Sequence, residues 1–99
     1  MSDVILQLQR WYEAQCNGDW EHQYGISVES LDNPGWRVEI DLKNTSLAGA
    51  SFTRVEERNR SGEWLLCRTE NDKFIGDGDP TKLIVIIEKF LEWTGLQSK

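Results

Sequence analysis

Residues 36–42 alternate without a break between apolar and polar side chains, and this pattern constrains the fold more than any other feature. The apolar positions are Trp36, Val38, Ile40 and Leu42, and the polar ones between them are Arg37, Glu39 and Asp41. Successive side chains of a strand point to opposite faces, so a period of two predicts a strand with one buried face. Such a strand belongs to a sheet that is covered on one side.

A turn signal connects this strand to an earlier one over residues 26–31. The intervening Asp32-Asn33-Pro34-Gly35 is typical of a type II turn. Proline presets the first central φ of that turn, and glycine accepts the positive φ of the second. We therefore expect an antiparallel hairpin in which Gly35 has a positive φ.

Three further strands are predicted after a small, polar loop over residues 43–51. They cover about residues 52–58, 64–69 and 73–76. The first of these is weakly patterned because it carries Arg54, Glu56, Glu57 and Arg58. Charged residues protect the open edge of a sheet, so this strand is predicted to be an edge strand.

The sequence predicts a helix at each end of the chain. The first covers residues 3–16, with Ser2 as its N-cap and Asn17-Gly18 as its stop. Its apolar stripe consists of Val4, Ile5, Leu8, Trp11, Tyr12 and Cys16. The last is capped by Asp79 and runs from Pro80 to about residue 94, where Gly95 ends it. The element order predicts one α+β domain over residues 1–99, an antiparallel sheet of about five strands flanked by an N-terminal and a C-terminal helix.

The charge balance narrows the choice of partner. Seventeen Asp and Glu against eleven Lys and Arg give a net charge of −6, which disfavours nucleic acid because that partner requires phosphate neutralisation. The acidity indicates either a soluble surface or a basic protein partner. The longest apolar run, residues 83–87, is far short of the ~18–20 residues of a membrane span. The first four residues do not resemble a secretion signal, so we expect a cytoplasmic protein with no membrane partner.

Candidate catalytic groups are few. His22 is the only histidine, and Cys16 and Cys67 lack the spacing of metal ligands. Cys67 falls inside a predicted strand, where no ring of N–H groups lowers a thiol pKa. We expect no catalytic residue, metal or cofactor. A small Cys- or His-dependent enzyme, such as a sulfurtransferase, is the alternative.

Two stretches of the chain are long and unusual: W-Y-x-x-Q-C-N-G-D-W-E-H-x-Y-G over residues 11–25, and L-D-N-P-G-W over residues 31–36. They resemble the immunity protein 53 family of bacterial polymorphic toxin systems. The resemblance implies a small cytosolic protein, encoded beside a toxin, that binds this toxin and protects the producing cell. It carries over no catalytic residue, and a generic small binding domain is the alternative.

The candidate toxin-binding residues lie in two predicted loops. They are Asp19, Trp20, Glu21, His22 and Tyr24 before the first strand, and Asp32 and Asn33 at the hairpin. Loops on a rigid scaffold often recognise partners, and this mixture of carboxylates and aromatic rings suits a basic protein such as a nuclease toxin. The alternative is that Trp20 and Tyr24 fold back over a helix end while Asp19 and Glu21 stay in water.

The remaining tryptophans are predicted from their place in each element. Trp11, Trp36 and Trp93 lie on apolar stripes and are predicted to be buried, whereas Trp64 begins a strand and is compatible with either environment.

Overall fold

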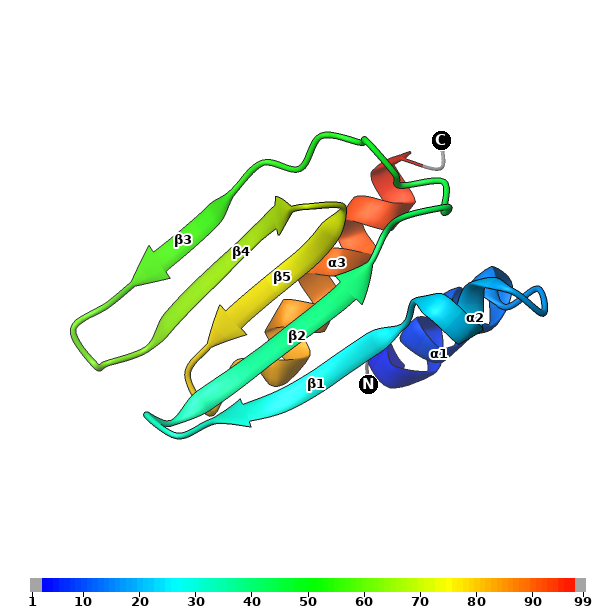
Figure 1. Ribbon diagram of the computed structural model, residues 1–99. Coiled ribbons are helices and arrows are strands. Elements are labelled where there is room, and N and C mark those ends of the chain that lie inside the picture. The colour runs from blue at the N-terminus through cyan, green and yellow to red at the C-terminus, as the bar shows by residue number, and fades with distance from the viewer. Residues whose placement is uncertain (1–2, 98–99) are drawn as a thin grey trace.

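The computed structural model describes residues 3–97 and consists of one antiparallel sheet with helices on one of its faces (Figure 1). The elements are α1 (Val4–Gln15), α2 (Trp20–Gln23), β1 (Ile26–Leu31), β2 (Gly35–Asp41), β3 (Val55–Arg58), β4 (Trp64–Glu70), β5 (Lys73–Gly78) and α3 (Leu83–Gln97). The strand order is β1-β2-β5-β4-β3, and every neighbouring pair is antiparallel. The predicted α+β class, with five strands and a helix from each end of the chain, is confirmed.

The core lies between this sheet face and the helices. Alternate residues of the central strands, Val38, Ile40, Cys67 and Phe74, point towards α3 and are completely buried. The helices contribute the rest of the buried cluster, namely Val4, Leu8, Ile86, Ile87, Phe90 and Trp93. Removal of these apolar surfaces from water, at about 25 cal/mol per Å², is the main force that holds α1 and α3 in place.

Two glycines of β5 allow α3 to lie close to the sheet. A Cβ on Gly76 would meet Cγ2 of Ile86, and a Cβ on Gly78 would lie 2.6 Å from Cβ of Lys82. A glycine inside a strand often marks such a close approach of another element. Ile86 therefore packs directly on the β5 backbone.

The hairpin between β1 and β2 is confirmed, but its predicted turn geometry is wrong. Gly35 is the first residue of β2, paired with Leu31, and is not among the glycines with positive φ in residues 3–97. Its requirement for glycine has another cause. A Cβ at this position would meet the carbonyl oxygen of Gly78 in the neighbouring strand β5.

The predicted ends of the C-terminal helix are also wrong. The helix begins at Leu83, not Pro80, because β5 extends to Gly78 and the Asp79 carboxylate accepts the backbone N–H of Thr81 at 2.8 Å in a separate turn. It continues through Gly95 to Gln97. Glycine inside a helix costs only about 1 kcal/mol relative to alanine, which the packing of the preceding turn offsets. The predicted cap of the first helix, Ser2, lies outside the described residues.

The edge position of β3 is confirmed, although the strand is shorter than predicted and begins at Val55. Among the tryptophans, Trp93 is buried as predicted. Trp11 and Trp36 are only half-buried at the margin of the core, so that prediction is wrong in degree. Trp36 lies at the end of the sheet, where its Nε1–H donates to the carbonyl oxygen of Pro80 at 3.0 Å.

Candidate interaction surface

The segment between α1 and β1 forms a short helix, α2, that the sequence analysis assigned to a loop. The Asn17 side-chain oxygen accepts the N–H groups of Asp19 at 3.0 Å and Trp20 at 2.9 Å. The Glu21 carboxylate in turn accepts the N–H groups of Asn17 at 2.9 Å and Gly18 at 2.8 Å. The pKa of Glu21 lies below its usual value, mainly because of a hydrogen bond from its own backbone N–H and further because of those from Asn17 and Gly18.

Trp20 is part of the protein interior, with 2% of its surface exposed. Its ring centroid lies 6.2 Å from that of Trp11 and 6.0 Å from those of Tyr12 and Tyr24. Its Nε1–H donates to the carbonyl oxygen of Lys43 at 2.9 Å. The indole therefore fastens α2 against α1 and the end of β2, as in the fold-back alternative.

The polar candidates of α2 stay at the surface. Asp19 and His22 are exposed, and Asp19 accepts a hydrogen bond from the Gln23 side chain at 3.4 Å. Glu21 and Tyr24 are half-buried. This group of residues borders the start of β1.

Asp32 and Asn33 lie exposed in the β1–β2 hairpin, at the other end of the same strand. The six residues of β1 span roughly 20 Å at ~3.3 Å per residue. The structure therefore does not gather the sequence candidates into one cluster. It places them as two groups that flank β1.

Beside the start of β1, next to the first of these groups, lies a groove that the sequence analysis missed. It has a volume of about 380 Å³ and is lined by Ile5, Leu8, Gln9, Tyr12, Gly25 and Ile26, from α1 and the start of β1. Beside it, Ile5 is 55% exposed, Val28 46% and Tyr12 36%. The helical spacing of α1 predicted a buried stripe that included Ile5 and Tyr12. The stripe is wider than the surface that α3 covers, and its outer part remains in contact with water.

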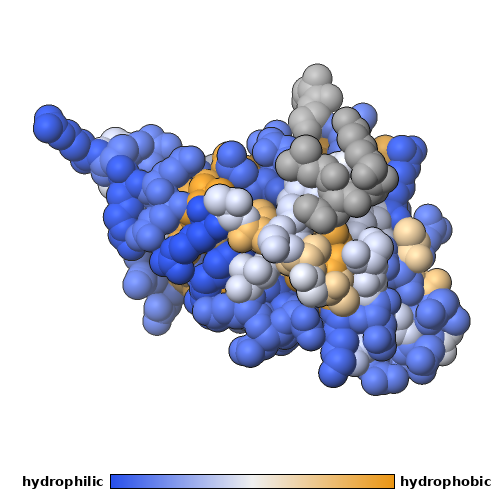
Figure 2. Space-filling model, turned by 90° about the horizontal axis from the view of Figure 1, so that it is seen from above, coloured by the Kyte–Doolittle hydropathy of each residue, from blue (hydrophilic) through white to orange (hydrophobic). Residues whose placement is uncertain are grey.

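Two exposed carboxylates near the two ends of β1 lack a cation. Among the described residues, no Lys, Arg or His lies within ion-pairing distance of Asp19 or Asp32. Seen from above, the side on which β3 and the β2–β3 loop lie in Figure 1, the surface is mostly hydrophilic, with hydrophobic residues mainly in its middle (Figure 2). An exposed apolar groove with an acidic border is the arrangement that suits a protein partner with basic residues around an apolar centre.

The sheet face away from the helices carries a different, internally compensated network. Asp77 is 5% exposed and accepts Nε–H of Arg37 at 2.6 Å and Nη2–H at 3.1 Å. Arg68 donates to the same carboxylate at 3.2 Å. The hydrogen bond from Asp77 is the main cause of the raised pKa of Arg37. These contacts tie β2, β4 and β5 together.

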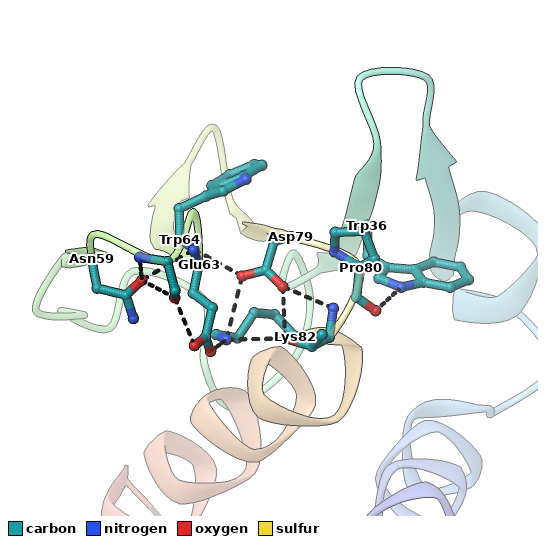
Figure 3. Close-up of polar contacts among 9 residues, drawn as sticks. Trp36, Asn59, Glu63, Trp64, Asp79, Pro80 and Lys82 are labelled. Carbon is teal, nitrogen blue, oxygen red and sulfur yellow. Dashed lines mark hydrogen bonds and ion pairs between the residues drawn. The ribbon is translucent and has the colours of Figure 1, made fainter.

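A second polar network fastens the start of β4 to the turn before α3 (Figure 3). Asp79 accepts the N–H of Trp64 at 2.8 Å and the hydroxyl of Thr81 at 2.6 Å. Lys82, directly before α3, reaches Glu63 at 2.5 Å and Asp79 at 3.3 Å. The Thr81 hydroxyl is the main cause of an Asp79 pKa far below the usual value, and the Lys82 ammonium lowers the pKa of Glu63. All of these groups satisfy one another, which is typical of a structural clamp.

The thiol of the enzyme alternative lies in an unsuitable environment. Cys67 is fully buried in β4, and burial raises the pKa of its thiol to about 12, which opposes formation of a thiolate nucleophile. Residues 3–97 contain no group of three or more His, Cys, Asp or Glu side chains placed to hold a metal ion. In the same part of the chain, no helix has the length and apolar character needed to cross a membrane.

The fold and this surface define a small α+β protein whose sheet is covered by helices on one face and which exposes an apolar groove between α1 and β1. The chain belongs to the immunity protein 53 family, whose model matches residues 5–95, and it is accordingly an immunity protein. No curated protein and no solved structure gives a significant match.

Proposed function

We propose that this immunity protein binds a cognate protein toxin of a bacterial polymorphic toxin system and neutralises it in the cytoplasm of the producing cell. Family membership supports the toxin partner. The net charge of −6 supports a toxin whose active-site surface is basic, as that of a nuclease is. Binding alone would neutralise such a toxin by denying the active site to nucleic acid.

The observation that carries the proposal is the exposed apolar groove bordered by uncompensated carboxylates. Apolar contacts in the centre of an interface supply affinity, and charges at its rim accelerate association. Ile5, Tyr12 and Val28 would form the apolar centre, and Asp19 and Asp32 would stand at the two ends of the rim.

The sequence candidates then divide into two roles. Asp19, His22, Asp32 and Asn33 are exposed and are proposed to contact the toxin directly. Trp20, Glu21 and Tyr24 are proposed to act indirectly, because their packing and hydrogen bonds hold α2 beside the groove.

Co-expression with the product of the neighbouring toxin gene tests the function. We expect wild-type chain to restore growth of cells that the toxin alone kills, and the purified proteins to form a stable complex. Continued killing together with the absence of a complex would refute the proposal.

Paired variants test the surface. Ile5→Ser should weaken toxin binding at least tenfold, about 1.4 kcal/mol, whereas Ile84→Ser, at a similarly exposed position of α3, should bind as wild type does. Asp32→Asn should slow association and reduce its salt dependence, whereas Asp72→Asn in the β4–β5 turn should not. Equal effects within each pair would place the interface elsewhere.

A further inference from the structure

The two edges of the sheet differ in how they are protected against pairing with another chain. The edge strand β3 has only four residues, of which Glu56, Glu57 and Arg58 are charged and exposed. The opposite edge strand, β1, has six residues with Glu29 as its single charge, and it contains neither proline nor lysine. Charges and short length disfavour pairing with another strand, so β3 is protected against such pairing and β1 is available for it.

The register of β1 on β2 shows which backbone groups this open edge presents. The N–H of Asp41 donates to the carbonyl oxygen of Gly25 at 3.0 Å, so residues 25 and 41 form a hydrogen-bonded pair. Antiparallel pairs alternate between bonded and non-bonded types. With Ile26 opposite Ile40 and Val28 opposite Val38, the N–H and C=O groups of Ile26, Val28 and Ser30 point away from β2. No other described residue satisfies them.

The side chains of the same three residues lie on the helix face of the sheet, where α1 forms the groove. Ile26 lines the groove, and Val28 is 46% exposed next along the strand. An extended segment added to β1 would thus satisfy the free backbone groups and also place alternate side chains against Ile5 and Tyr12. Recognition by strand addition uses this combination of backbone hydrogen bonds and side-chain pockets.

We propose that an extended segment of the toxin binds as a sixth strand along β1, with apolar side chains in the α1–β1 groove and basic side chains near Glu29 and Asp32. This inference rests on the proposed toxin-binding function. Charge selects the toxin over a second copy of this chain, since each copy carries −6 and would bring its own Glu29 and Asp32 to the shared edge.

Residue-resolved amide hydrogen exchange of the wild-type chain, free and bound to the product of the neighbouring toxin gene, tests the proposal. In the free chain, amides 26, 28 and 30 should exchange fast, and amides 27 and 29, bonded to β2, should exchange slowly. Toxin should slow exchange at 26, 28 and 30 at least tenfold. The outward amides of β3, at Glu56 and Arg58, are the internal control and should not change.

Proline substitutions provide a matched pair of variants. Val28→Pro removes an outward N–H from β1 without removing a β1–β2 hydrogen bond, and Glu56→Pro does the same at β3. Val28→Pro should weaken toxin binding at least tenfold, and Glu56→Pro should leave it unchanged. Val28→Lys keeps the N–H but adds a positive charge to the edge, and it should also weaken binding if Val28→Pro does not fold.

Each other outcome overturns the inference. A complex without new protection at 26, 28 and 30 would refute strand addition while leaving toxin binding intact. Protection of these amides in the free chain that grows with its concentration would identify a second copy as the occupant. Failure of the wild-type chain to bind the toxin would refute both the strand addition and the proposed function.

Discussion

The indole Nε1–H of Trp20 donates a hydrogen bond to the carbonyl oxygen of Lys43, 2.9 Å away and 23 residues further along the chain. This contact joins α2 to the segment that follows β2, and three aromatic rings pack around the same indole. Trp20, which the sequence analysis listed as a candidate toxin-binding residue, thus stabilises the fold.

Trp20→Ala is expected to lower the free energy of unfolding by about 3–5 kcal/mol, as is usual for loss of a buried aromatic side chain. Trp20→Phe keeps most of the ring contacts and loses the hydrogen bond to Lys43, so its cost should be nearer 1 kcal/mol. Urea unfolding of the three proteins measures both. A Trp20→Ala variant as stable as wild type would contradict the buried position.

Gly35→Ala is expected to destabilise the protein by about 1–3 kcal/mol, because the new Cβ would meet the Gly78 carbonyl oxygen and push β2 away from β5. Gly25→Ala is the matched control, since a Cβ there meets no atom within 4 Å. Thermal unfolding of both variants shows the difference. Equal melting temperatures would mean that the strands separate at no cost.

Asp77→Asn is expected to cost about 2 kcal/mol, because it leaves the guanidinium groups of Arg37 and Arg68 side by side without their shared anion. Glu56→Gln breaks contacts to Arg54 and Arg58 whose side chains are 59% and 70% exposed, and should cost less than about 0.5 kcal/mol. Chemical denaturation at low salt compares them. A similar cost for both would show that the Asp77 network adds nothing beyond a surface ion pair.

Acid is expected to weaken the clamp around Asp79. The pKa of this carboxyl is lower in the folded protein than in the unfolded chain, because hydrogen bonds from Thr81 and Trp64 favour the charged form. The unfolded chain therefore binds more protons as pH falls below about 4, and the stabilisation present at neutral pH is lost towards lower pH. Glu63, whose pKa is lowered chiefly by Lys82, adds to the same trend.

Asp79→Asn tests this dependence. The variant should be less stable than wild type at pH 7, and the difference should shrink between about pH 4 and pH 2. Urea unfolding across this pH range gives the measurement, with Asp72→Asn in an exposed turn as the control. A difference between wild type and Asp79→Asn that stays constant with pH would contradict the assigned role of the carboxylate.

Local sequence signals predicted much of the fold because they depend on neighbours along the chain. The alternation in β2 and the helical spacing in α1 each placed an element of the right type, and the charges of β3 correctly predicted an edge strand. The predictions are wrong where a residue distant in the sequence determines the local structure. Gly35 is constrained by the carbonyl oxygen of Gly78 in the neighbouring strand. The helix α3 begins later than predicted because β5 extends to Gly78 and the backbone N–H of Trp64 donates to Asp79 in the turn that follows.

The candidate surface shows the same division. The sequence by itself determined the α+β class, the acidic charge and the segments that carry the family signature, since these depend on composition and local spacing. Only the tertiary structure decided that Trp20 is buried while Ile5 and Val28 are exposed. An amphipathic stripe identifies the apolar side chains of an element. Which of them are buried depends on the area that α3 covers and on the position of β1 at the edge of the sheet.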